Sequence, residues 1–188
     1  MPMFDWNRTA TPAERRTFWG CFCGWSLDTF DNQVLAFLLP VLMAASHFSK
    51  TEAGLIATSS LLAAAFGGWV SGILSDRHGR VRVLTWSIIW FTVFSIIGGL
   101  TNSYHQLLVV RALQGLGFGA EWAVGAVLLG EMIKSGDRGK VIGTVHSGAA
   151  IGSGIAALLA GPFVAALPAE YGWRVVFWLG VLPAVLVF

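Results

Sequence analysis

Four ionisable side chains lie inside long apolar stretches of this sequence. Asp28 and Asp31 occur in the first stretch, and Arg111 and Glu121 occur in the fourth. Charged groups at membrane depth are costly and usually mark ion or substrate pathways. Each of the four is therefore a candidate functional residue.

Asp28 and Asp31 are three residues apart, which places both carboxyl groups on one face of a helix. Two carboxylates this close in a medium of low dielectric constant repel each other. Unless a cation lies nearby, one of them is expected to gain and lose a proton near neutral pH, as proton-coupled transport requires. The alternative is a structural polar pair, satisfied by the backbone or by a neighbouring helix.

Arg111, Gln114 and Glu121 share one face of the fourth apolar segment, which is expected to point into a helical bundle. Arg111 has about the same expected depth as Asp31, so the two could pair. Arg111 could instead bind the carboxylate of a substrate through two hydrogen bonds, or simply tie helices together. Glu121 is either a second proton site or a structural partner of another helix.

The composition points to a membrane protein made of helices. Of the 188 residues, 55% are hydrophobic and only 12% are charged, with a mean hydropathy of +0.69; soluble domains average about 25% charged residues. The sequence has no stripe of basic residues on a polar face, which a nucleic-acid-binding protein would show. The four histidines are scattered, and Cys21 and Cys23 point to different sides of a helix. We therefore expect no enzyme, no metal and no cofactor apart from a coupling proton.

Six apolar segments approach the ~20 residues that a helix needs to cross a bilayer. They cover residues 18–45, 54–75, 83–101, 106–130, 141–167 and 175–188. The last is short for a crossing, which predicts a truncated sixth helix with further helices missing. Residues 1–17 are interpreted as a tail and residues 18–188 as one six-helix transmembrane domain.

The basic residues are distributed unevenly between the two sides of the predicted bundle. The tail and the second and fourth loops carry nine of them: Arg8, Arg15, Arg16, Arg77, Arg80, Arg82, Lys134, Arg138 and Lys140. The opposite side carries only Lys50 and Arg174. Since cytoplasmic loops are enriched in Lys and Arg, the N-terminus is predicted to be cytoplasmic.

The loop between the second and third segments resembles the G-x-x-x-D-R-x-G-R signature of the major facilitator superfamily. The matching residues are Gly72, Asp76, Arg77, Gly79 and Arg80. The resemblance implies that Asp76, Arg77 and Arg80 latch the two halves of a transporter together on the cytoplasmic side. The next position, usually basic in the family, is Val81 here.

A second motif, Arg111-Ala-Leu-Gln-Gly-Leu-Gly-Phe-Gly119, resembles the family's fourth-helix motif, whose arginine is implicated in proton coupling. Ala120-Glu121-Trp122 and the D-x-x-D of Asp28 and Asp31 are similar to metabolite:proton symporters of the sialate/lactate and aromatic-acid type. Glu131, at the membrane edge, is expected to pair with basic loop residues rather than touch substrate.

This resemblance implies the N-terminal half of a carrier, an all-α membrane protein with six helices in 3+3 inverted repeats. It implies proton-coupled uptake of a small organic anion, such as a monocarboxylate, a sialate or an aromatic acid. It also implies a bacterial-type inner membrane, with the lipid bilayer, protons and a missing C-terminal half as partners.

Two other interpretations remain open. The first is a sugar or drug carrier, against which the sugar-porter motif P-x-Y-x-x-E and the antiporter motif G-P-x-x-G-G are both absent. The second is a truncated membrane fragment that does not transport. His146 could titrate in the fifth segment, but a buried, neutral, hydrogen-bonded histidine is expected.

Overall fold

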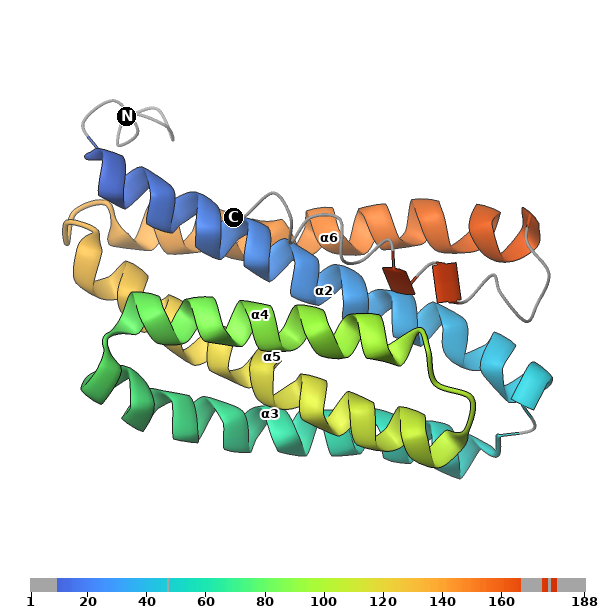
Figure 1. Ribbon diagram of the computed structural model, residues 1–188. Helices are drawn as coiled ribbons and strands as arrows, with labels where there is room; N and C mark the ends of the chain where they lie inside the picture. Colours follow the sequence, from blue (N-terminus) through green and yellow to red (C-terminus); the bar gives the residue numbers. More distant parts are fainter. Residues whose placement is uncertain (1–9, 47, 167–173, 176, 179–188) are drawn as a thin grey trace.

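The computed structural model describes residues 10–46, 48–166, 174–175 and 177–178, and all regular structure within them is helical. The long helices are α2 (Pro12–Ser46), α3 (Lys50–His78), α4 (Arg80–Gly98), α5 (Tyr104–Met132) and α6 (Arg138–Ala166). They lie lengthwise beside one another as a bundle (Figure 1). The predicted all-α fold is confirmed for these residues.

Four of these helices are long and apolar enough to cross a membrane, namely α3, α4, α5 and residues Arg138–Leu159 of α6. Helix α2 has 35 residues but is absent from this set. Its interior carries Asp28, Asp31 and neighbouring amides, which lower the mean hydropathy.

The predicted helix positions agree with the structure, although α2 and α3 begin earlier than expected, at Pro12 and Lys50. The sixth predicted segment, 175–188, falls largely outside the described residues. Residues 174–175 and 177–178 are helical. The count of six helices, the 3+3 repeat and the division at residue 17 stay predictions.

Capping boxes start two of the helices, and the Ser103 side chain caps a third, α5. Ser49 and Glu52 form a capping box at α3, in which the Ser49 amide donates to Glu52 Oε2 at 2.8 Å and the Glu52 amide donates to Ser49 Oγ at 3.2 Å. This confirms the S-x-x-E start expected from the sequence. Thr11 and Glu14 make the same contacts at α2, and hydrogen bonds from Thr11 hold the pKa of Glu14 below its ordinary value.

A single residue, Gly79, connects α3 to α4. Its φ of +89° lies in the region that residues with a Cβ rarely adopt. The chain therefore reverses within one residue, and Arg80 at the start of α4 comes back beside the last turn of α3.

Glycines let the helix backbones approach closely. A Cβ at Gly119 of α5 would overlap the Ala64 carbonyl oxygen of α3, and a Cβ at Gly152 of α6 would overlap the Ser26 carbonyl oxygen of α2. The small residues expected to allow close helix approach thus do so in both pairs, α3 with α5 and α2 with α6.

The start of α2, the α3–α4 turn and the α5–α6 connection lie at one end of the bundle (Figure 1). That end gathers the described basic residues of the tail and of both loops, whereas Lys50 starts α3 at the other end. The fold therefore places these basic segments on one side, as the charge distribution predicts.

Two apolar clusters of buried residues occupy the two ends of the bundle. One includes Phe18 and Val124, near the basic end. The other includes Val34 and Leu38, further along α2. Along α2, the buried Asp28 lies between the two clusters and the buried Asp31 directly follows Phe30 of the second cluster, so both carboxyl groups are enclosed by apolar packing.

Candidate functional site

The centre of the bundle holds a buried hydrogen-bonded network that joins α2, α4 and α5. Arg111 Nη1 forms an ion pair with Asp31 Oδ2, and each side chain is only 2% exposed. Gln114 Nε2 donates to the same Asp31 oxygen at 3.0 Å, and Ser95 Oγ donates to Asp31 Oδ1 at 2.9 Å. Arg111 Nη1 also donates to Gln114 Oε1 at 2.9 Å, so the network closes on itself.

Arg111 is thus paired with Asp31, one of the two arrangements that the sequence left open. Its guanidinium also lies over the ring of Phe177, with 4.4 Å between Cζ and the ring centroid. Its Nε and Nη2 atoms are buried and donate no hydrogen bond to any described residue. Because a guanidinium can bind a carboxylate through two nitrogens, the side chain retains donors for an anion.

Asp28 is in a different situation from Asp31. Its side chain is fully buried, and neither carboxyl oxygen accepts a hydrogen bond from a described residue. Its electrostatic neighbours are Glu121 and Asp31, both acidic. Asp28 and Asp31 therefore differ in their surroundings: the Asp31 carboxylate accepts hydrogen bonds from Ser95, Gln114 and Arg111, whereas the Asp28 carboxyl group accepts none from a described residue.

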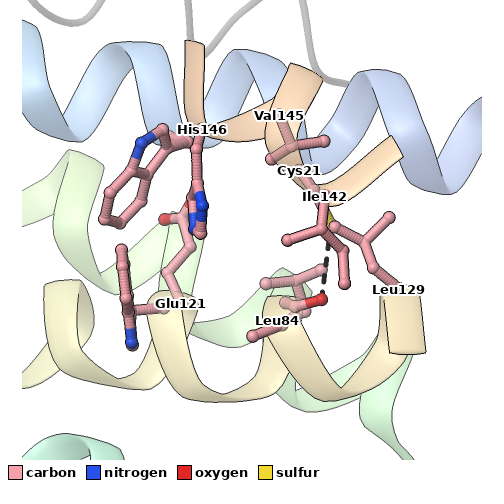
Figure 2. Close-up of a pocket in the computed structure, with 11 residues that line it drawn as sticks. Cys21, Leu84, Glu121, Leu129, Ile142, Val145 and His146 are labelled. Carbon is pink, nitrogen blue, oxygen red and sulfur yellow. Dashed lines mark hydrogen bonds between the residues drawn. The ribbon is translucent and has the colours of Figure 1, made fainter. Parts of the chain in front are cut away.

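Glu121 lines a cavity of about 30 Å³ between α2, α5 and α6. This volume is enough for one or two water molecules. In Figure 2 the Glu121 side chain rises from α5 toward His146 of α6. Its Oε1 atom is buried without a partner among the described residues, and the carboxyl group packs directly against Gly24.

His146 is exposed on α6, so the expectation of a buried histidine is wrong. Its ring stacks on Trp122, with 5.2 Å between centroids and 14° between planes. The reason is positional: α6 turns this residue toward the aromatic side chains of α2 and α5 rather than into either apolar cluster.

The signature loop forms its own charge cluster at the basic end. Arg80 Nε donates to both Glu131 oxygens, at 2.8 and 2.7 Å, and Arg80 Nη2 lies 3.1 Å from Asp76 Oδ1. The structure thus brings Glu131 of α5 against a basic loop residue. Arg77, the other arginine of the motif, forms no ion pair with these two carboxylates. The latching role of the loop remains a prediction.

Two members of the central network were not expected from the sequence. Ser95 is a hydroxyl group in an apolar helix, two turns beyond the buried Ser87, and that spacing is a signal that could have identified it. Phe177 carries no such signal, because one aromatic residue among many apolar ones is not distinctive.

The chain matches known transporters along its length. The model of the Major Facilitator Superfamily matches residues 21–188. A probable 4-methylmuconolactone transporter of Cupriavidus pinatubonensis is 51% identical over 98% of this chain and 43% of its own length. The cis,cis-muconate transport protein of Acinetobacter baylyi is 32% identical over 96% of this chain and 43% of its own length.

The fold also matches a solved structure. The xylose transporter XylE from E. coli, in a partially occluded inward-open conformation, superposes with a TM-score of 0.81 at 18% identity, over 93% of this chain and 48% of that chain. The chain spans less than half the length of the curated relatives it matches. It belongs to the major facilitator superfamily, a family of integral membrane transporters and not of enzymes.

Proposed function

We propose that this chain is the N-terminal part of a proton-coupled symporter that takes up a small organic anion. The observation that supports it most is the buried Asp31–Arg111 pair, enclosed by Ser95 and Gln114 and adjacent to the unpartnered carboxyl group of Asp28. Intramembrane charges of both signs in one layer provide a place for a proton and a place for an anion.

The exchange between these two ligands follows from the geometry. While Asp31 is ionised, it holds Arg111 through the ion pair, and hydrogen bonds from Ser95 and Gln114 hold the Asp31 carboxylate in place. Protonation of Asp31 removes the negative charge from the pair, and the guanidinium then becomes available to a substrate carboxylate. Binding of the proton and of the anion therefore favour each other, as symport requires.

Similarity supports the substrate class. The relative at 51% identity is named as a methylmuconolactone transporter, and another is named as a muconate transporter. We extend organic-acid transport to this chain, within a class that includes monocarboxylates, sialates and aromatic acids. A sugar substrate receives no comparable support, because the likeness to the xylose transporter at 18% identity shows the fold alone.

The remaining features of the proposal concern the surroundings of the chain. A C-terminal half would complete the pathway, because the matched relatives are more than twice as long. The transporter would lie in a bacterial-type inner membrane with its N-terminus in the cytoplasm. This orientation is favoured because basic residues are enriched on the cytoplasmic side of membrane proteins. The proton would be its only coupling ion. Asp76, Arg77 and Arg80 of the loop would latch the halves, with Glu131 as the charge partner of Arg80.

The test uses the full-length transporter that contains these residues, reconstituted in liposomes. With an inward proton gradient, labelled cis,cis-muconate is expected to accumulate, and a protonophore is expected to abolish the accumulation. Asp31→Asn should lose gradient-driven accumulation, because an amide does not exchange the proton. Asp137→Asn, at a partly exposed loop residue, is the matched control and should accumulate normally.

Muconate uptake that is independent of the proton gradient would contradict the symport proposal. Equal accumulation by Asp31→Asn and the unmodified transporter would remove Asp31 from proton coupling.

A further inference from the structure

Three aromatic side chains from three helices form a continuous surface, nearer to the basic end of the bundle than the Asp31–Arg111 network. Trp25 of α2 lies 4.1 Å from Trp122 of α5 between ring centroids, and His146 of α6 lies 5.6 Å from Trp25. The nearly parallel stacking of His146 on Trp122 completes the contact between α5 and α6. No part of the central network uses these three rings.

This aromatic surface is accessible from outside the bundle. Trp122 is 45% exposed, and His146 is also exposed. A planar molecule could therefore lie against these rings without moving the helices apart.

Polar atoms without partners lie at the base of the same surface. The indole Nε1 of Trp25 is buried with no acceptor among the described residues, and Glu121 Oε1 is buried with no donor. Both residues line the cavity that His146 and Trp122 also line. Since buried polar atoms are nearly always hydrogen-bonded, a donor and an acceptor left free around a cavity of about 30 Å³ indicate a bound water at the base of the aromatic surface.

The depth of the rings argues against an ordinary interfacial tryptophan belt. Trp122 lies ten residues before the end of α5 at Met132, which corresponds to about 15 Å along the helix. That distance is about half of the hydrocarbon thickness. Tryptophan belts lie at the headgroup level, whereas this aromatic surface lies near the middle of the bilayer, at the depth expected of a transported substrate.

We infer that Trp25, Trp122 and His146 form a stacking surface for the planar, conjugated part of the transported acid. The inference rests on the proposed function and specifies its substrate class. It predicts a preference for acids with conjugated double bonds or an aromatic ring over saturated acids of equal length and charge.

The test compares cis,cis-muconate with adipate, because both are six-carbon dicarboxylates and only muconate is conjugated. Competition for uptake is measured in the full-length transporter, which should prefer muconate. Trp122→Leu keeps an apolar side chain but removes the π-system, and it should reduce the preference by about two- to tenfold, the range that one stacked pair contributes. Trp122→Phe should retain most of it. Trp69→Leu is the control, on the exposed face of α3.

A second measurement covers the case in which Trp122→Leu does not fold. Muconate, unlike adipate, is then expected to quench tryptophan fluorescence in the unmodified transporter, and Trp122→Phe should remove a large part of that quenching.

The outcomes separate the inference from the proposed function. If neither acid is taken up in a gradient-dependent manner, the proposed function fails, and the inference fails with it. If both acids are transported but the unmodified protein has no preference, or Trp122→Leu keeps it in full, the stacking surface is refuted and symport stands. If the leucine variant is unfolded, the stacking surface is refuted when muconate quenches the tryptophan fluorescence of the unmodified transporter no more than adipate does.

Discussion

Removing one member of the buried Asp31–Arg111 pair is expected to destabilise the protein far more than removing both. Each side chain is 2% exposed, so neither charge can turn to solvent when its partner is lost. Arg111→Met leaves Asp31 with donors only from Ser95 and Gln114, and Asp31→Leu leaves the guanidinium without an anion. Breaking a buried pair in this way costs about 3–5 kcal/mol for each single change.

The double variant, Asp31→Leu with Arg111→Met, replaces both charges with apolar side chains of similar length. Such replacements are often neutral in themselves. The remaining cost is that Ser95 and Gln114 each lose an acceptor, at about 1–3 kcal/mol each. Asp31→Leu alone carries this same cost, so it cancels in the cycle. The double variant should therefore be more stable than additivity predicts by at least the cost of Arg111→Met alone, about 3 kcal/mol.

The assay is equilibrium unfolding of the full-length transporter in mixed micelles with increasing SDS, performed on all four members of the cycle. A control cycle uses Asp137 and Lys140, a partly exposed pair 3.9 Å apart, whose coupling should be under about 0.5 kcal/mol. Additive losses at the central pair would refute the reasoning, because they would mean that neither charge depends on the other for its burial.

Three further predictions concern packing, the network and the loop. Gly119→Val should destabilise the protein by about 1–3 kcal/mol in the same SDS assay, because a side chain there meets backbone of α3 that cannot move aside. The control is Gly130→Ala in the same helix, which has open space around it and should be neutral or stabilising by up to about 1 kcal/mol. Ser95→Ala should cost about 1–3 kcal/mol by the same measure, because buried Asp31 loses a donor; an unchanged midpoint would argue against this bond. Glu131→Gln should change the free energy of unfolding by less than about 1 kcal/mol, because its ion pair with Arg80 is partly exposed. It should nevertheless alter the transport rate in liposomes, because the loop is proposed to latch the two halves together. An unaltered rate would contradict this latching role.

The membrane class and the candidate residues could be predicted from sequence because the signals are local. A low charged fraction and apolar runs of helical length do not depend on how helices pack. A charge inside such a run is conspicuous in itself, which is why Asp28, Asp31, Arg111 and Glu121 stand out in the sequence alone. The start of α3 was equally accessible, because a capping box needs only four consecutive residues.

Some local signals nevertheless misled. His146 was expected to be buried because a histidine inside an apolar helix usually is, yet the rotation of α6 exposes it. The polar side chains inside α2 also lower its mean hydropathy, although the apolar segment 18–45 is still recognisable from the sequence.

What the sequence by itself determined, therefore, is the kind of protein and the short set of residues able to handle charge. Only the tertiary structure decided their relations: Asp31 pairs with Arg111 from 80 residues away, Asp28 remains without a donor among the described residues, and three aromatic rings from three helices meet. The physical reason is that hydropathy and spacing fix which face of a helix is polar, whereas the depth and rotation at which two helices pack determine which polar groups touch. Those quantities depend on contacts such as Gly119 against Ala64, which join segments that are distant along the chain.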